Sequence, residues 1–168
     1  MVLKIEPITK AVQSLISNSK FLISKKRQRT RVVLLSAKGK TFTQKDVRRL
    51  VKYEQLIFIC GRYEGVDERV AKNVADEELS IGNYVLFGGE VAAMVLIEAV
   101  SRLIPGVIAK PESVKNESFS DKAAKTREYP QYTRPEIFTL GGKKLKVPKV
   151  LLSGNHREIE KWRKQRSK

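Results

Sequence analysis

The sequence predicts an α/β domain with a mostly parallel sheet. Two short runs, Val32–Leu35 and Leu56–Cys60, have the apolar, β-branched composition of buried strands, and a third strand-like stretch, Tyr84–Phe87, lies between glycines. Segments with helical spacing alternate with these runs, which is typical of parallel sheets. Because ligands bind beyond the carboxyl ends of such strands, we expect the functional residues in the loops that follow them.

The helices in the first half are predicted from spacing and from their end signals. Residues 7–16 carry an apolar side chain every four residues, beginning at Ile8. Thr43 and Asp46 have the spacing of a capping box, so a helix should begin there and run to about Lys52.

The second half contains the strongest predicted helix. Residues 67–75 are expected to be helical, and residues 90–103 carry apolar groups on most faces, which predicts a buried helix. Residues 107–135 are polar without a period and are interpreted as a long loop. The tail, residues 156–168, should form a short basic helix that carries Trp162.

Composition restricts the class of protein. The 168 residues suit one domain, or one domain with an appendage, and 41% apolar with 31% charged residues is a globular mixture. Lys and Arg number 34 against 18 acidic residues, a net charge of +16 that indicates a polyanionic partner. One Cys excludes an internal disulfide, and one His argues against a zinc site or a Ser-His-Asp triad. Without a signal peptide or an apolar run that could cross a bilayer, we expect a cytoplasmic protein that does not contact membranes.

Three glycine-bearing loops follow the predicted strands: residues 36–40, residues 61–65, and residues 80–89. Each alone has an ordinary explanation as a tight turn of an α/β fold. Three in succession at strand ends favour a ligand site, because glycine lets the backbone approach a ligand closely. None matches the P-loop or the dinucleotide-binding pattern, so a nucleotide-like ligand would be held in another way.

Five longer motifs resemble those of a known protein family. They are Cys60–Arg69 (CGRYEGVDER), Ser80–Glu90 (SIGNYVLFGGE), Ser101–Val107 (SRLIPGV), Tyr132–Pro135 (YTRP) and Pro148–His156 (PKVLLSGNH). With these motifs in order along the chain, it closely resembles the bacterial tRNA (guanine-N1)-methyltransferases, the TrmD family of the SPOUT superfamily.

The resemblance implies a SPOUT-type parallel sheet with helices on both faces and a deep C-terminal trefoil knot, an exception to the rule of unknotted connections. It also implies that backbone groups of the knot loops hold S-adenosylmethionine. The residues carried over are Leu35, Ser36, Gly61, Tyr63, Glu64, Ile81, Gly82, Asn83, Tyr84, Val85, Leu86, Gly88 and Gly89. No metal ligands are carried over, although Mg²⁺ dependence without a dedicated protein site is compatible with the family.

The implied reaction moves a methyl group to N1 of the guanosine on the 3′ side of the tRNA anticodon (position 37), which maintains the reading frame. N1 carries a proton, so a base must remove it, and charge then builds on O6. The family's base corresponds to Glu117 and its cation to Arg102. From the residues alone, Glu117 has the ordinary explanation of a solvated loop carboxylate, and Arg102 that of a cation opposing a helix dipole. His156 is expected to begin the tail helix.

The family also implies partners and a division of the chain. We expect a cofactor-binding knotted domain over residues 1–108, a linker with the catalytic acid over 109–135, and the start of a basic tRNA-binding region over 136–168. Residues 20–31 hold six further cations. The partners implied are tRNA and a second copy of the chain, in a homodimer whose active sites are shared between subunits.

The sequence departs from the family at both ends. Met1-Val2 aligns with the end of the family's Gly-Gly-Gly-Pro-Gly-Met loop, so its first strand and helix, and most of its C-terminal helical domain, are expected to be missing. Either the start was assigned at an internal Met or the chain is a fragment. Ala37-Lys38 stands where members often have Pro-Gln or Pro-Arg. The alternative function is a truncated, non-catalytic RNA-binding or cofactor-binding remnant of the enzyme; a SPOUT enzyme acting on other RNA is disfavoured by the motifs around Glu117 and Tyr132–Pro135.

Overall fold

The computed structural model describes residues 1–18, 29–110, 117–120 and 126–167. The chain forms two compact units, Met1–Ala109 and Lys110–Lys168, called here the first and second unit. Most of the basic segment 20–31 and parts of the predicted linker lie outside the described residues.

The first unit is built on a parallel three-stranded sheet in the order β2-β1-β3. The strands are β1 (Thr30–Thr41), β2 (Gln55–Cys60) and β3 (Glu77–Ser80). β1 pairs with β2 from Thr30↔Gln55 to Leu35↔Cys60, and with β3 from Val33↔Glu77. The predicted α/β class and parallel sheet are confirmed. The trefoil knot and the missing first strand stay predictions.

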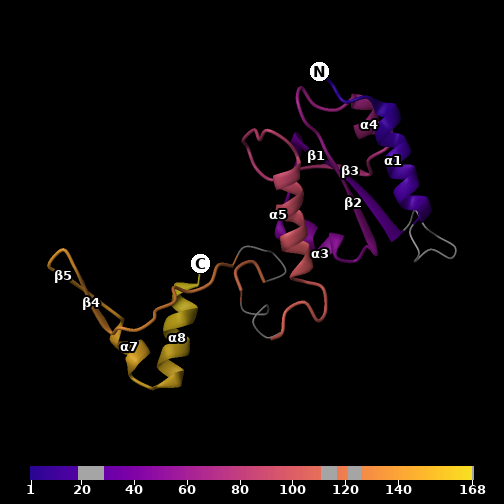
Figure 1. Cartoon of the computed structure of the whole chain (residues 1–168). Coiled ribbons are helices and arrows are strands. Elements are labelled where there is room, and N and C mark those ends of the chain that lie inside the picture. Colours follow the sequence, from indigo (N-terminus) through magenta and orange to yellow (C-terminus); the bar gives the residue numbers. More distant parts are fainter. Residues whose placement is uncertain (19–28, 111–116, 121–125, 168) are drawn as a thin grey trace. The chain divides into compact units, whose positions relative to one another are not determined.

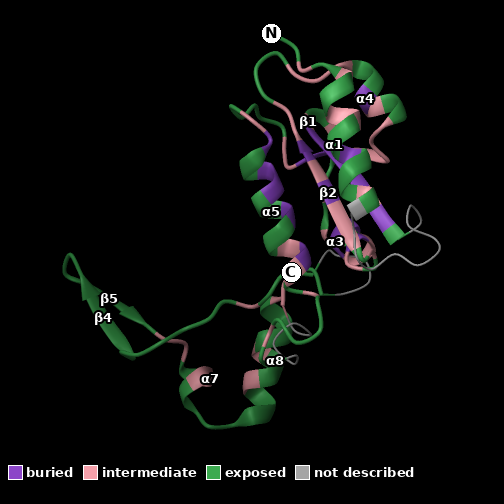
Figure 2. Cartoon of the chain, turned by 45° about the vertical axis from the view of Figure 1, so that its right-hand side comes forward, coloured by how far each residue is buried: buried purple, intermediate pink, exposed green. Residues whose placement is uncertain are grey.

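Helices cover both faces of the sheet, as Figure 1 shows. They are α1 (Ile5–Asn18) and α4 (Glu68–Asn73) on one face, and α3 (Gln44–Leu50) and α5 (Glu90–Ser101) on the other. Successive residues of a strand point to opposite faces. Accordingly Val32 and Leu34 pack with Val12 of α1, whereas Val33 and Leu35 pack with the α3 and α5 side. Both faces of β1 are therefore buried over Val32–Leu35, as its apolar run predicts (Figure 2).

The α3 capping box is confirmed. The Thr43 backbone N–H and side-chain hydroxyl donate to Asp46 Oδ2 at 3.1 and 2.8 Å. Lys40 Nζ and Arg49 add an ion pair each to Asp46, at 2.7 and 3.2 Å, although the side chain is only 2% exposed. Burial raises the pKa of the Asp46 carboxyl, but the hydrogen bonds from Lys40, Thr43 and Arg49 outweigh it and lower the pKa to about 2.

Two predictions in the first unit are wrong. The third strand is Glu77–Ser80, and Tyr84–Phe87 is a loop in which Phe87 is 98% exposed. Glycines at 82, 88 and 89 bend the chain there, so its apolar composition does not make it a strand. The helix over 90–103 forms, as α5, but only Ala92, Ala93, Leu96 and Val100 are buried, and its outer face is apolar and exposed.

The second unit contains a hairpin and two helices. These are β4 (Ile137–Leu140) paired antiparallel with β5 (Lys143–Lys146), then α7 (Lys149–Leu152) and α8 (His156–Arg166). The tail helix is confirmed and begins at His156, with Asn155 as its N-cap. No helix or strand is predicted from the sequence for residues 136–147, where the hairpin lies, although Gly141-Gly142 between β-forming runs is a hairpin signal.

Candidate functional site

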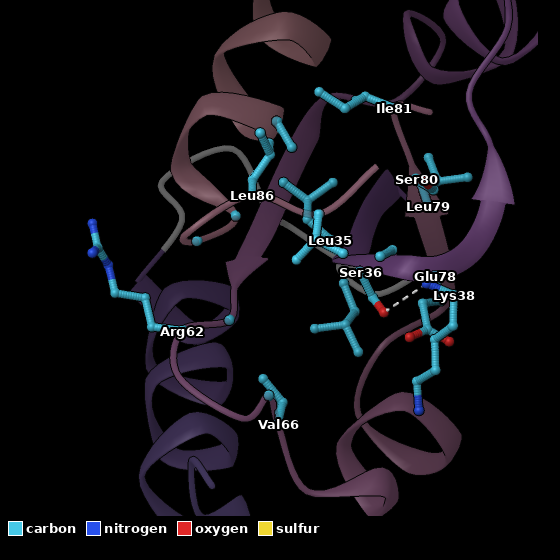
Figure 3. Close-up of a pocket in the computed structure, with 18 of the residues that line it drawn as sticks. Leu35, Ser36, Lys38, Arg62, Val66, Glu78, Leu79, Ser80, Ile81 and Leu86 are labelled. Carbon is cyan, nitrogen blue, oxygen red and sulfur yellow. Dashed lines mark hydrogen bonds between the residues drawn. The ribbon is translucent and has the colours of Figure 1, made fainter. Parts of the chain in front are cut away.

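A cavity of about 450 Å³ opens at the carboxyl ends of β1, β2 and β3. Three loops form it: residues 36–39, residues 61–66 and residues 81–89. Figure 3 shows Leu35, Ile81 and Leu86 on its apolar side, and Ser36, Lys38 and Glu78 at a polar end. A volume of this size is typical of small-molecule sites, and its place agrees with the rule for parallel sheets.

The first loop is an insertion within β1. Leu35 and Lys40 both pair with Leu79, so residues 36–39 leave the ladder, and residues 36–38 line the cavity. A Cβ on Gly39 would lie 2.7 Å from the Glu78 carbonyl carbon, so only glycine fits against β3 here. Within the loop, the Lys38 backbone N–H donates to Ser36 Oγ at 3.3 Å.

The second loop connects β2 to α4. Tyr63 has a positive φ of 60° and Gly65 one of 110°, and the Gly65 N–H donates to the Arg62 carbonyl at 3.2 Å. The N-terminal segment pairs with this loop, because the Leu3 N–H donates to the Gly65 carbonyl at 2.9 Å. The loop is therefore held in a tight turn with Tyr63 and Glu64 facing the cavity region.

The third loop joins β3 to α5 and is tied to the second. The Gly89 N–H donates to the Gly61 carbonyl at 2.9 Å, and Arg62 and Gly88 form an isolated bridge. A Cβ on Gly89 would lie 2.8 Å from Cys60 Cα, so the close approach requires glycine. Burial, and then the Glu90 carboxylate, raise the pKa of the Cys60 thiol, so Cys60 is a poor nucleophile.

Two exposed ion pairs join the loops to the adjacent helices. Lys38 Nζ lies 2.5 Å from Glu68 Oε2, and Arg62 Nε lies 2.6 Å from Glu90 Oε1. The hydrogen bonds from Lys38 and Arg62 hold the pKa values of the Glu68 and Glu90 carboxyls below their usual range. The cavity rim thus carries both signs of charge.

The structure brings twelve of the thirteen predicted cofactor residues to this one cavity. They are Leu35, Ser36, Gly61, Tyr63, Glu64, Ile81, Gly82, Tyr84, Val85, Leu86, Gly88 and Gly89. Asn83 does not line it. Their role in binding stays a prediction.

Sequence reasoning missed several polar residues of the cavity wall, among them Lys38, Arg62 and Glu78. Glu78 Oε1 is a buried atom that has no hydrogen-bond partner within the described part of the chain. Arg62 lies inside the Gly61–Gly65 motif and could have been found from it. Glu78 lies in β3, a segment whose sequence does not predict a strand.

The two predicted catalytic residues belong to different units. Arg102 is the exposed C-cap of α5 in the first unit. Glu117 is half-buried in the second unit, in a turn where the Ser120 N–H donates to its carbonyl at 3.1 Å. The Phe119 N–H, donating to the Thr126 carbonyl at 2.6 Å, joins that turn to the following segment.

The second unit has an open groove of about 860 Å³ beside α8. Tyr132 and Trp162 face one another with ring centroids 6.2 Å apart, and the Arg163 guanidinium lies 4.9 Å from the Tyr129 ring centre. Arginine next to half-exposed aromatic rings is a common arrangement for stacking unpaired bases.

No group of three or more His, Cys, Asp or Glu side chains among the described residues could hold a metal ion. Among the helices described, none has the length and apolar character needed to span a bilayer.

Comparison with known proteins gives a consistent result. A family model described as tRNA (Guanine-1)-methyltransferase TrmD matches residues 1–168. A tRNA (guanine-N(1)-)-methyltransferase of Carboxydothermus hydrogenoformans is 51% identical, over 99% of this chain and 59% of that protein. Proteins of the same name from Geotalea uraniireducens and Mycoplasma mobile are 48% and 50% identical over 99% of this chain, which covers 62% and 75% of their lengths. The chain therefore spans about three fifths of the length of the first two relatives.

Proposed function

Because the chain belongs to the tRNA (guanine-1)-methyltransferase TrmD family, we propose that it transfers a methyl group from S-adenosylmethionine to N1 of the guanosine 3′-adjacent to the tRNA anticodon, at position 37. This modification maintains the reading frame, and we expect it to take place in the cytoplasm. The observation that carries the proposal is that residues from three separate loops, all expected to hold the cofactor, line one cavity at the carboxyl edge of the sheet.

The cavity fits S-adenosylmethionine. Leu35, Ile81 and Leu86 offer an apolar surface for the adenine, and the glycines at 61, 82, 88 and 89 let the backbone of the second and third loops line the cavity. When bound, S-adenosylmethionine supplies an electrophilic methyl group. At the polar end of the cavity, the unpartnered Glu78 Oε1 could accept a hydrogen bond from a ligand.

Two side chains act on the target base in this proposal. The Glu117 carboxylate takes the proton from N1, which frees the N1 lone pair to form the new bond. The Arg102 guanidinium lies beside O6 and stabilises the negative charge that builds there. The proposal assigns neither of these steps to a metal ion. A dependence on Mg²⁺ would arise without a dedicated metal site in the protein.

The reaction also requires that the two units meet, and we propose a homodimer in which the first unit of one subunit meets the second unit of the other. The outer face of α5 supports a second copy of the chain against the first unit, because Val91, Met94, Val95 and Ile97 are exposed there, and Met94 is 67% exposed. An apolar helix stripe of this kind is unusual on a monomer and suits a second copy of the same surface.

The experiment is methyl transfer from labelled S-adenosylmethionine to an unmodified tRNA transcript with guanosine at position 37, followed by nucleoside digestion. The expected product is 1-methylguanosine. A folded chain that binds tRNA but yields no product would contradict the proposal and favour the non-catalytic alternative.

The cofactor site has its own test in Gly61→Val. A Cβ at this position already lies 3.0 Å from Val66 Cγ2, so the larger side chain should crowd the cavity. We expect S-adenosylhomocysteine to bind at least tenfold more weakly in calorimetry. Unchanged affinity would remove the second loop from the site.

A further inference from the structure

We propose that the Glu78 carboxylate makes the cavity selective for a positively charged ligand, and so for the methyl donor over its demethylated product. S-adenosylmethionine contains a positively charged sulfonium, whereas S-adenosylhomocysteine, which remains after methyl transfer, contains a neutral thioether. The inference rests on the proposed function and deepens it. It assigns the discrimination between two ligands of nearly the same shape to a residue that lies outside the family motifs.

The charge of the cavity wall is opposite to the charge of the chain. The chain has 34 Lys and Arg against 18 acidic residues, a net charge of +16. The charged side chains that line the cavity are nevertheless three glutamates, one lysine and one arginine: Glu64, Glu68, Glu78, Lys38 and Arg62. The acidic wall is therefore a local feature of the cavity, and it does not suit the polyanionic partner that the overall charge indicates.

Both cations of the wall already have acidic partners. Lys38 Nζ lies 2.5 Å from Glu68 Oε2, and Arg62 Nε lies 2.6 Å from Glu90 Oε1 at the start of α5. Glu78, in contrast, forms no ion pair with any residue that the structure describes. Since the charges within each pair largely cancel, the charge of Glu78 is left to act on a ligand.

The position of Glu78 makes its charge effective. Glu64 also forms no ion pair with a described residue, but it is exposed, so water screens its charge. Glu78 is half-buried, and its Oε1 is a buried atom without a hydrogen-bond partner among the described residues. Figure 3 shows the side chain at the polar end of the cavity, next to Lys38. A buried carboxylate oxygen without a donor is unfavourable, and a cation in the cavity would compensate it.

The charge of Glu78 acts on its surroundings without a direct contact. The pKa of the Lys38 ammonium is raised, chiefly by its hydrogen bond with Glu68 and the charge of Glu68, and further by the charge of Glu78. At the effective dielectric constant of about 20 typical of protein surfaces, opposite charges ~8 Å apart attract strongly enough to change an equilibrium constant by roughly tenfold or more. The selectivity therefore does not require the sulfonium to touch the carboxylate.

The charge difference favours the exchange of product for donor. The ligand loses its positive charge when the methyl group leaves, so its attraction to Glu78 ends with the reaction. The effect belongs to binding rather than to the chemical step, because a group that stabilises the sulfonium of the bound donor stabilises less the transition state, in which that charge is decreasing. Glu78 is thus a specificity-determining residue and not a catalytic one.

The test measures ligand affinity without RNA, by isothermal titration calorimetry on the full chain. The ligands are S-adenosylmethionine, S-adenosylhomocysteine and sinefungin, an analogue in which a carbon bearing an ammonium group replaces the sulfonium. Glu78→Gln removes the charge at nearly constant shape, and Glu78→Asp keeps it. The matched control, Glu6→Gln, removes one negative charge from an exposed position of α1 that does not line the cavity.

We expect Glu78→Gln to weaken the two charged ligands, relative to S-adenosylhomocysteine, by at least about fivefold. The affinity for S-adenosylhomocysteine itself should change by less than about twofold, and Glu78→Asp and Glu6→Gln should keep the wild-type ratios within about twofold. Lys38→Gln removes a positive charge from the wall and should shift the ratios in the opposite direction, by a smaller factor because Lys38 is exposed.

Equal losses of affinity for all three ligands in Glu78→Gln would overturn the inference, since charge would then have no part in the effect. Unchanged ratios in that variant would do the same, and so would an equal change in Glu6→Gln. A wild-type chain that binds none of the three ligands would remove the inference together with the cofactor assignment. A chain whose selectivity depends on Glu78 but which forms no 1-methylguanosine would leave the inference standing and remove the proposed function.

Discussion

The first unit buries side chains on both faces of its sheet, whereas no described residue of the second unit is buried. The first unit is therefore stabilised by apolar burial and carries a preformed cavity. The second depends on local features, such as the Asn155 cap and the Gly141-Gly142 turn, and carries cations and aromatic rings at its surface. The proposed function matches this difference: it assigns the cofactor to the well-packed unit and the large, charged partner to the unit without a buried core.

The largest expected effect tests whether catalysis needs both units. Glu117→Gln in the second unit removes the proposed base, so kcat should fall by roughly 10²- to 10⁴-fold. Because the cavity belongs to the first unit, S-adenosylhomocysteine affinity should stay within about twofold in calorimetry. Turnover at the wild-type rate would exclude Glu117 as the base.

The next comparison is of stability. Leu96 in α5 is fully buried, and Leu96→Ala should lower the free energy of unfolding by about 2–5 kcal/mol in urea denaturation. Leu140→Ala, on the exposed β4 strand, is the matched change and should alter it by less than about 0.5 kcal/mol. Similar losses would mean that the second unit also has a buried core.

Acid should destabilise the first unit through Asp46. Its pKa is about 2 in the folded chain and ~3.9 in an unfolded one. Since the folded carboxyl binds its proton more weakly, its contribution is fully present above about pH 5 and is lost as pH falls toward 2. The contribution at neutral pH is about 2 kcal/mol.

Asp46→Asn should therefore destabilise the chain at pH 7 and flatten the decline in stability between pH 5 and pH 2, measured by urea denaturation at each pH. A variant as acid-sensitive as the wild type would assign the decline to other carboxyls, such as Glu77.

The smallest effect concerns a cap in the second unit. Asn155 Oδ1 accepts from the Glu158 N–H at 3.3 Å, so Asn155→Ala should cost α8 about 1 kcal/mol. Hydrogen exchange of the α8 amides should accelerate roughly fivefold, with no change in β1. Acceleration in both places would show that the two units unfold together.

The sequence predicts the fold of the first unit best where local pattern and burial agree. β1 and β2 are apolar, and the α3 capping box needs only Thr43 and Asp46. β3 was not predictable in this way, because its first two residues, Glu77 and Glu78, are acidic. In the fold the Glu77 carboxylate has ion-pair partners in Arg31 at 2.7 Å and Arg49 at 2.6 Å, which come from elsewhere in the chain. The exposed loop over Tyr84–Phe87 has strand-like composition for a different reason, since its side chains line or border the cavity.

The candidate site was likewise predictable from the sequence only in part. The glycine loops were visible as ligand-site candidates from their positions at strand ends, and the resemblance supplied the individual residues. The pairing of Lys38 with Glu68 depends on an approach between residues 30 positions apart, which spacing does not reveal. The β4–β5 hairpin had a usable signal in its Gly-Gly turn, whereas the assignment of residues to its two faces required the register.

The insertion in β1 has a consequence for how the cavity responds to a ligand. Leu35 and Lys40, which flank it, both pair with Leu79 of β3, so residues 36–39 form a short loop whose two ends meet at the same point of the sheet. Such a loop can open and close while the strand pairing on either side of it stays intact. Movements of the loop therefore need not disturb the sheet, and occupancy of the cavity should change amide exchange in residues 36–38 and in the two other loops that line it, while exchange in the paired part of β1 stays the same.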